Sequence, residues 1–592
     1  MSAVRRYLVA AGLVIIIISV WQRWGADTWS PLATPTKSHI QPIDKDFFWR
    51  TVTHQYPVTS FRPLPTAAVD VLPHVQAKFG PESADQKQTR LTRRDTIKRA
   101  FSRSWKAYKE HAWLRDEVKP ITGKPVDTFG GWGATLVDSL DTLWIMGFRE
   151  EFSLAVQAVS NNISFRTTEA ETINVFETTI RFLGGLLGAY DLSGDTRLLS
   201  KAQDVGDMLY KAFDTPNHLP VTRWDIHAAG RGETQTAHGN TLLAELGSLS
   251  MEFSRLSIVT GNPKYYDAVQ HISELLAASQ MKTKVPGLWP IVVDAAREEF
   301  DLGSDYGLGG MSDSTYEYLP KMAALLGQKT GIYADMYLRS METSNRHLLF
   351  RPMTPKGDDI LFPGSLHASR SNNQVSTTLD PSAGHLTCFV GGMLAVGGQI
   401  MSNKTHVELA DKVTKGCIWA YSSFGRGVMP ETMSLTPCPS RSGCVWSDSS
   451  WHLAALSAQS ASKEDDGEKL VEEQRLPPSF TKIPDARYIL RPEAVESIFV
   501  MYRVTGDPAW QDAAWRMWNA IDELTHTELA NTAVWNVNPK HGEEPGKADS
   551  MESFWLGETL KYLYLVFSEP ELVSLDDWVF NTEAHPFRRL KK

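Results

Sequence analysis

Acidic side chains stand inside several otherwise apolar helical segments, at spacings that put them on one face of a helix. These residues are Glu177 with Arg181, Asp313 with Glu317, Glu493 with Glu496, and the single positions Asp138, Asp141 and Glu558. A carboxylate on a core-facing helix is costly unless it is paired, hydrogen-bonded or used for function. Any one of these acids is readily explained as a helix cap or a satisfied ion pair. Their recurrence at similar positions along the chain is harder to explain in that way and favours a shared pocket.

Carboxylates that crowd one pocket can do two kinds of chemistry. Mutual repulsion raises the pKa of some of them and leaves others ionised, which is the condition for paired acid and base work, as in glycoside hydrolysis. The same crowding suits a hard cation, which is bound by oxygen atoms. The acids therefore indicate a hydrolytic or cation-binding site.

A longer repeated unit positions these acids. Each unit has an acidic residue, an apolar helix rich in Gly and Leu, and a polar turn, as at residues 177–195, 243–262, 314–331, 491–507 and 552–567. The first turns are about 70 residues apart, too long for common solenoid repeats and long enough for one inner and one outer helix with loops. The chain then holds roughly seven helix pairs, which either stay an open solenoid or close into a toroid. In a toroid, equivalent acids converge on one axis.

The composition narrows the class of protein. The chain has 592 residues, 42% of them hydrophobic and 22% charged, with a net charge of −9. These values exclude a wholly disordered chain and a small disulfide-stapled scaffold. No broad basic surface is indicated, so we expect no nucleic-acid partner. The chain also has 19 tryptophans, whose indoles either fill a large core or line a site for a flat or sugar-like ligand.

The N-terminal segment predicts a membrane anchor. Residues 7–21 carry no charge, Arg5 and Arg6 precede them, and no small-residue cleavage site follows. This pattern favours an uncleaved signal anchor over a cleaved signal peptide and places the rest of the chain in the lumen. The expected parts are a cytosolic tail at 1–6, a transmembrane anchor at 7–24, a proline-rich stem at 25–95 and a helical body at 96–592.

A lumenal chain can form disulfides between its four cysteines, and four cysteines allow three pairings. Cys438 and Cys444 flank a turn-like stretch, so a local bridge between them is one possibility. That bridge would leave Cys388 with Cys417. Free buried thiols are the alternative.

The acidic segments resemble the class I α-1,2-mannosidases, glycoside hydrolase family 47. The matching stretches are GWGATLVDSLDTLWIMG (131–147), NVFETTIRFLGGLLGAY (174–190), SDSTYEYLPK (312–321), HLTCFVGGMLA (385–395), RPEAVESIFVMYRVTGD (491–507), ESFWLGETLKYLYL (552–565) and FNTEAHPF (580–587). Together they extend over about residues 96–588, in the family's order. Each stretch alone is moderately specific, but the set is very specific.

The resemblance implies an all-α fold, an (α/α)7 barrel, and a calcium-dependent, inverting exo-hydrolase of terminal α-1,2-linked mannose on high-mannose N-glycans. Glu177 matches the general acid and Glu493 the base that activates the attacking water, while Asp313 is the third catalytic carboxylate. Within the family the acid role is disputed between the positions of Glu177 and Asp313. An inverting enzyme needs its two carboxyl groups roughly 6.5–9.5 Å apart to leave room for the water.

The resemblance also implies a set of binding residues. Thr582 matches the Ca²⁺ ligand through its carbonyl and hydroxyl oxygens, and Ca²⁺ accepts further oxygens from waters and a sugar diol. The other matched positions are Arg181, His385, Glu431, Arg491, Glu496, Phe554, Glu558 and Glu583, with Phe554 stacking on the sugar. For His385 a satisfied core histidine is an equal alternative. Cys388 and Cys417 match the family disulfide.

One position departs from part of the family. Members that remove a single specific mannose carry Arg two residues before the catalytic Asp, and here that position is Met311. Met cannot hydrogen-bond the hydroxyls of one branch, so we expect trimming of several branches. The expected location is the ER or Golgi membrane, with the catalytic body in the lumen. The alternatives are a lectin-like relative that mainly binds misfolded glycoproteins for degradation, and a non-catalytic helical scaffold.

Overall fold

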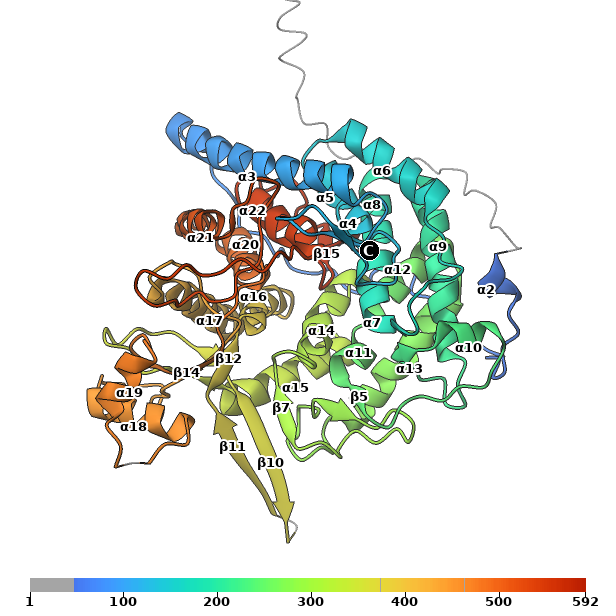
Figure 1. Cartoon of the computed structure of the whole chain (residues 1–592). Helices are drawn as coiled ribbons and strands as arrows, with labels where there is room; N and C mark the ends of the chain where they lie inside the picture. The colour runs from blue at the N-terminus through green and yellow to red at the C-terminus, as the bar shows by residue number, and fades with distance from the viewer. Residues whose placement is uncertain (1–46, 373, 463) are drawn as a thin grey trace, which may run out of the picture. The chain divides into compact units, whose positions relative to one another are not determined.

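Helices dominate the computed structural model, which describes residues 47–372, 374–462 and 464–592 (Figure 1). All of these residues belong to one compact unit, Gln41–Lys592. Strands are short apart from the hairpin of β10 (Ser365–Ser371) and β11 (Gln374–Asp380). The predicted anchor at 7–24 lies outside the described residues. Within them, no helix combines the length and the apolar character needed to cross a bilayer.

One set of helices is buried along almost its whole length. Its members are α5 (Leu140–Ile145), α8 (Gly184–Ser193), α12 (Ser250–Thr260), α14 (Asp313–Leu326), α16 (Phe389–Ile400), α20 (Glu493–Thr505) and α22 (Leu560–Val566). Each of them packs against the next, from α5 to α22. The π-helical turn η4 (Trp555–Thr559), which leads into α22, packs against α5 again.

A second set packs outside the first. These helices are α6 (Arg149–Asn162), α9 (Thr196–Tyr210), α13 (Pro263–Ser279), α15 (Ile332–His347), α17 (Lys404–Ser423) and α21 (Ala509–Thr525), each against the inner helix before it. The long helix α3 (Ala84–His111) packs against α22. Seven inner–outer pairs therefore follow one another in the described part of the chain, around a ring in Figure 1. A Cβ at Gly391 of α16 would collide with Thr414 of α17, so glycine permits the close contact.

The C-terminal hairpin lies inside this ring of helices. Its strands are β15 (Trp578–Phe580) and β16 (Pro586–Arg588), and they pack against α14 and α8. The turn between them, residues 581–585, is buried apart from partial exposure of Thr582. Asn581 fixes the turn because its amide donates to Ile180 O at 3.0 Å and to Glu252 Oε1 at 2.8 Å. The turn therefore presents Thr582 and Glu583 to the middle of the inner helices.

A buried ion network holds the base of this turn, and we call it the balanced network. Lys561 Nζ and His585 Nδ1 each lie 2.7 Å from a different oxygen of Asp141. His585 Nε2 lies 3.5 Å from Asp138 Oδ1. Burial alone would lower the pKa of His585, but the charge of Asp141 and its hydrogen bonds to both aspartates raise it. With His585 protonated, two negative and two positive charges cancel.

The described part of the predicted stem lies against the helices, and we call residues 47–82 the strap. Trp49 is buried and donates to Phe165 O, while Arg50 pairs with Asp204 and Asp207 of α9. Further along, backbone N–H groups of the strap bond Asp214, Asp267 and Asp576. Helix α3 then begins at Ala84, inside the predicted stem segment, because Ser83 and Gln86 form a capping box.

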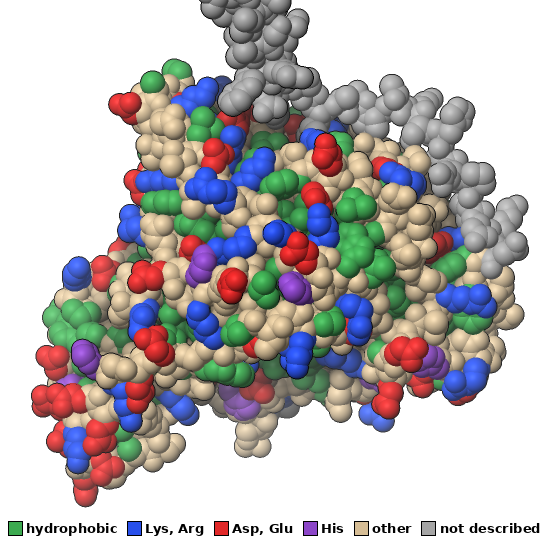
Figure 2. Space-filling view, turned by 45° about the horizontal axis from the view of Figure 1, so that its top comes forward, with side chains coloured by type: hydrophobic (Ala, Val, Ile, Leu, Met, Phe, Trp, Pro, Cys, Tyr) green, Lys and Arg blue, Asp and Glu red, His purple; other side chains and the backbone are tan. Residues whose placement is uncertain are grey.

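Both cysteine pairs are closed. Cys388–Cys417 joins the start of α16 to α17, as the family resemblance predicts. Cys438–Cys444 closes the local loop. On the face shown in Figure 2, basic and acidic side chains are scattered among uncharged ones.

Candidate functional site

A cavity of about 340 Å³ opens among the inner helices, beside the C-terminal turn. Ten predicted site residues line it, and we call it the acid pocket: Glu177, Arg181, Met311, Asp313, Arg491, Glu493, Phe554, Glu558, Thr582 and Glu583. The structure thus brings together residues from five of the matching stretches. His385, Glu431 and Glu496 do not line the cavity. His385 and Glu431 contact Glu493 and Arg491, which do, and Glu496 Oε1 lies 3.4 Å from Lys321 Nζ.

Glu177 ends the single turn α7 (Val175–Glu177) and is partly exposed to the cavity. The amide oxygen of Asn174 caps this turn by accepting from Phe176 N and Glu177 N. Arg181, one helical turn later in the π-helix η1 (Thr178–Leu183), donates from Nε to Glu177 Oε2 at 3.0 Å and from Nη1 to Glu583 Oε2 at 2.6 Å. Arg181 therefore holds two carboxylates in place, and these come from segments that are far apart in the sequence.

Asp313 is the first residue of α14, and its Oδ1 accepts from Ser314 N at 2.8 Å. Burial raises its pKa to about 7, with further contributions from the charges of Glu317 and Glu493. A carboxyl group with this pKa holds or releases a proton near neutral pH. Asp313 can therefore serve as an acid or as a base.

Glu493 is the first residue of α20, and its side chain is 12% exposed. Burial raises its pKa to about 7, although the charge of Arg491 opposes the rise. Its Oε2 lies 3.5 Å from Nδ1 of buried His385, and neither atom has a hydrogen-bond partner within the described residues. Burial, followed by the charge of Arg491, lowers the pKa of His385, so its imidazole is neutral. The free Oε2 is able to accept a proton.

Glu431 stands behind Arg491. Its Oε2 accepts from Arg491 Nε at 2.5 Å, and its Oε1 accepts from Ile489 N at 3.3 Å. Glu431 therefore does not line the cavity itself but holds Arg491, which does.

The atoms around Thr582 that could coordinate a cation are oxygen atoms. The Thr582 hydroxyl donates to Glu317 Oε2 at 2.8 Å, which leaves its lone pairs free. Lys321 pairs with Glu317 and lies 3.4 Å from Glu496 Oε1. Within the described residues, no three His, Cys, Asp or Glu side chains are arranged to hold a metal by themselves. A hard cation here would thus need main-chain, hydroxyl and water oxygens, which suits Ca²⁺.

Negative charge exceeds positive charge in and behind the acid pocket. Burial raises the pKa of Glu496 and of Glu583 to about 8, and that of Glu558 well above its usual range. For Glu558 the neighbouring charges of Glu583 and Glu493 add to the effect of burial. A divalent cation would relieve this repulsion.

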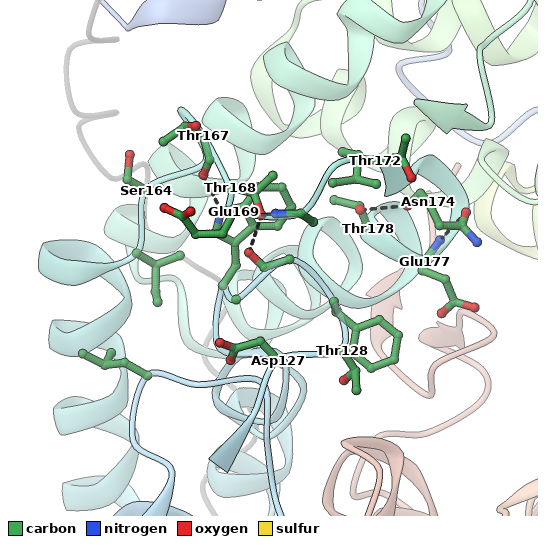
Figure 3. A pocket seen from close by; sticks show the side chains of 18 of the residues that line it. Asp127, Thr128, Ser164, Thr167, Thr168, Glu169, Thr172, Asn174, Glu177 and Thr178 are labelled. Atoms are coloured by element: carbon green, nitrogen blue, oxygen red, sulfur yellow. Dashed lines mark hydrogen bonds between the residues drawn. The ribbon is translucent and has the colours of Figure 1, made fainter. Parts of the chain in front are cut away.

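A second cavity of about 800 Å³ adjoins the acid pocket, and we call it the side groove. The two share Asn174, Glu177 and Arg223. Figure 3 shows Glu177 and Asn174 at one side of the groove and Ser164 at the other. The side chains of Thr167, Glu169 and Thr172 line it and make no hydrogen bond or ion pair within the described residues. The acid pocket therefore opens toward the wide polar surface of the side groove.

Two acids of the cavity wall, Glu245 and Glu552, were not predicted. Glu245 accepts from Asn174 and pairs with Arg223. It lies within the repeated unit at 243–262, so the repeat contained a signal for it. Glu552 directly precedes the SFW triplet of a matching stretch. Lys321 was also missed, since nothing in a sequence tells which acid a buried lysine will face.

Known proteins resemble this chain over most of its length. The family model of glycosyl hydrolase family 47 matches residues 100–589. The endoplasmic reticulum mannosyl-oligosaccharide 1,2-alpha-mannosidase of Rattus norvegicus is 35% identical over 82% of this chain. A mannosyl-oligosaccharide 1,2-alpha-mannosidase of Arabidopsis thaliana is 34% identical over 86% of this chain and 80% of its own length. The chain spans just under two thirds of its rat and human relatives, 66% and 62% of their lengths.

A solved structure agrees with these matches. The alpha-1,2-mannosidase from Trichoderma reesei superposes with a TM-score of 0.72 at 30% identity, covering 84% of this chain and 99% of that one.

Proposed function

The chain belongs to glycosyl hydrolase family 47, and from this membership we propose that it removes terminal α-1,2-linked mannose from high-mannose N-glycans during glycoprotein maturation. The observation that carries the proposal is the acid pocket itself. Asp313 and Glu493 each begin an inner helix, line one cavity, and have pKa values of about 7. Two carboxyl groups poised near neutral pH are what acid and base catalysis of glycoside hydrolysis requires.

We assign the base to Glu493, because its buried Oε2 is free to accept a proton from an attacking water. Glu177 or Asp313 supplies the proton to the departing sugar oxygen. The ion pair with Arg181 orients Glu177 toward the cavity. If attack and departure occur on opposite faces of the sugar, the configuration of the sugar inverts. Phe554 offers its ring to a bound mannose, and Arg491, held by Glu431, offers hydrogen-bond donors to its hydroxyls.

We propose Ca²⁺ as the cofactor. The carbonyl and hydroxyl oxygens of Thr582 would hold it, and its waters would be held by the carboxylates of Glu558 and Glu583, which line the same cavity as Thr582, and of Glu496. The ion would supply positive charge for binding a sugar diol. The excess of buried carboxylates supports this assignment, since they repel one another when no cation is bound.

The fold and location complete the proposal. The closed succession of inner-helix contacts supports an (α/α)7 barrel. The apolar segment at 7–24 supports a single-pass type II anchor, with the barrel in the lumen of the ER or Golgi. Met311 at the cavity wall supports trimming of several branches. A glycan time course that stops after one mannose would contradict this last part.

The test of the function is release of free mannose from a purified high-mannose oligosaccharide by the full-length chain in detergent. We expect release that is abolished by chelating Ca²⁺ and restored by adding it back. Glu493→Gln should abolish release while leaving oligosaccharide binding in place. Binding without any release by the unmodified protein would favour the lectin-like alternative. A proton NMR spectrum of the first product would show the β-anomer if the reaction inverts.

A further inference from the structure

Trp535 is unusual among the tryptophans that the structure describes. It is 56% exposed, and no other described tryptophan is more than about a third exposed. Its indole N–H has no hydrogen-bond partner within the described residues, unlike the indoles of Trp49, Trp132 and Trp451. A large apolar ring left in water is costly. Its position relative to the acid pocket suggests a use.

The backbone places Trp535 at the edge of the acid pocket. Tyr488 and Val534 exchange two hydrogen bonds, of 3.1 and 2.9 Å, as an antiparallel pair. Trp535 is consequently the cross-strand neighbour of Arg487, and Ile489 is its diagonal neighbour. Cross-strand side chains on one face of such a pair lie roughly 5 Å apart and diagonal ones roughly 7–8 Å apart.

The alternation of side chains shows which face Trp535 occupies. Tyr488 and Val534 are fully buried and point to the inner side of this short ladder. Arg487, Ile489 and Trp535 therefore point to the other side, and Ile489 lines the acid pocket. A third backbone segment, which includes Gly546, belongs to the same ladder. A Cβ at Gly546 would lie 3.3 Å from Trp535 Cδ1. The indole thus lies over a glycine, and more than half of the side chain stays exposed.

Charged groups stand beside the indole. Arg487 binds Asp485 through two hydrogen bonds, Nε to Oδ1 at 2.9 Å and Nη2 to Oδ2 at 2.6 Å. The carbonyl of Arg487 accepts from Glu431 N at 2.9 Å, so this strand is tied directly to the residue that holds Arg491. The side chains of Arg487 and Asp485 are 45% and 29% exposed. They offer solvent-facing donors and acceptors in a fixed arrangement.

We propose that Trp535, Arg487 and Asp485, the outer platform, bind a hexose unit of the oligosaccharide other than the one that is cleaved. The flat face of the indole suits the C–H face of a sugar ring, because the ring face is negative and C–H groups carry partial positive charge. The Arg487–Asp485 pair suits its hydroxyls, which donate and accept at once. The inference rests on the proposed function and adds a second point of attachment for a branched substrate.

Such a platform would act on substrate affinity rather than on the bond-breaking step. A disaccharide that fills only the acid pocket would not reach it. A branched high-mannose oligosaccharide would gain contacts at both places. The platform should therefore set the difference in KM between large and small substrates.

The test compares two substrates in matched variants. Trp535→Ala should raise KM for a branched high-mannose oligosaccharide by about tenfold, the effect of one aromatic contact, and leave hydrolysis of α-1,2-mannobiose unchanged. Trp535→Tyr should restore most of the loss. Trp446→Ala, the same change beside α18 (Asp448–Ala458), should alter neither substrate, because Trp446 contacts Trp451 and Asp448 rather than the strand of Arg487 and Ile489.

Two results would overturn the platform. One is an unchanged KM for the branched substrate in Trp535→Ala. The other is an equal loss on both substrates, which would indicate a structural effect on the acid pocket. If the unmodified protein releases mannose from neither substrate, the proposed function fails separately. Calorimetric titration of Glu493→Gln and of Glu493→Gln with Trp535→Ala then decides the platform, since about tenfold weaker oligosaccharide binding in the double variant is expected.

Discussion

The acid pocket and the balanced network bury similar groups within the same ring of inner helices, yet their charges differ. The balanced network pairs Asp138 and Asp141 with Lys561 and with His585, whose pKa is raised by the charge of Asp141, and its charges cancel when His585 is protonated. In the acid pocket, the carboxylates outnumber Arg181, Arg491 and the neighbouring Lys321. The pKa values follow this difference. Burial alone would raise the pKa of Asp138, but His585 and Arg181 hold it low, whereas those of Glu493 and Asp313 rise to about 7.

The comparison separates two meanings of a buried acid. Where each buried charge is paired with an opposite charge, the pair holds two structural elements together and is not available to transfer a proton. Where charges lack partners, the folded state carries repulsion that a substrate, a proton or a cation can relieve. A substitution should therefore cost stability in the first region and activity in the second.

The largest expected effect is on activity in the acid pocket. Glu493→Gln should lower kcat by about 10³- to 10⁴-fold, since it removes the proposed base. Thermal unfolding should change little, because the buried Oε2 has no hydrogen-bond partner among the described residues and the ion pair of Oε1 with Arg491 is long, at 3.5 Å. Steady-state kinetics and calorimetry of the same preparation measure both. Glu150→Gln, on the exposed first turn of α6, is the control. Retained activity in Glu493→Gln would show that the base is a different residue.

The balanced network should respond in the opposite way. Asp141→Asn leaves Lys561 and His585 without their shared partner and should lower the free energy of unfolding by about 3 kcal/mol or more. Urea titration followed by fluorescence measures the loss. Asp411→Asn removes the acid of an exposed pair with Lys415 and should cost under about 1 kcal/mol. Equal losses in the two variants would remove the distinction between the regions.

The pH dependence of stability tests the charge excess without a mutation. In the acid pocket, the pKa values of Asp313 and Glu493 are about 7 when folded, well above the ordinary carboxyl range. The folded state therefore holds protons that the unfolded chain has released, and the contribution of these two groups to the free energy of unfolding is greatest at low pH. From this pair we expect the chelated protein to lose about 5 kcal/mol of its free energy of unfolding between about pH 5 and pH 8, roughly 2–3 kcal/mol for each group.

Added Ca²⁺ should reduce that loss, because positive charge near the carboxylates lowers their pKa values. Differential scanning calorimetry at both pH values, with chelator and with Ca²⁺, measures the two slopes. Identical slopes with and without Ca²⁺ would mean that the cation does not bind among these acids.

The smallest expected effect comes from adding one positive charge at the pocket wall. Met311 is 57% exposed and lies two residues before Asp313. Met311→Arg should move the acidic limb of the pH–rate profile down by about 0.3–0.5 pH units, the size expected for a solvent-screened charge. Met311→Gln is polar and uncharged and should leave the limb in place. A shift in both variants would point to a change of shape rather than of charge.

Much of this arrangement could be predicted from the sequence, for identifiable reasons. The acids at 177, 313 and 493 were recognisable because Asp313 and Glu493 each begin an apolar helix in a matching stretch and Glu177 directly precedes the apolar segment of η1. Asp138 and Asp141 have the same appearance in the sequence, yet they belong to the balanced network. Their partners Lys561 and His585 are more than 400 residues away. Which charges meet depends on how the helices close on one another, and that information is not local.

The strap shows the same limit. The eight prolines and weak periodicity of residues 25–95 indicated a stem, but acids on α9, on α13 and in a turn before β15 hold its described part. Asp204, Asp267 and Asp576 occupy positions that look like ordinary surface acids in the sequence. Only the folded arrangement shows that strap backbone and side chains bind them.

The C-terminal turn has a consequence for the timing of synthesis. Arg181 binds Glu583, 402 residues later, and Thr582 sits beside it. A ribosome adds about 5–20 residues per second, so roughly 20–80 seconds separate the appearance of these two partners. Until residues 582 and 583 have been translated, the pocket lacks the threonine proposed to hold its cation. A nascent chain that already contains Glu177, Asp313 and Glu493 is therefore still without a complete site, and the site is assembled only after the turn at 581–585 has been made.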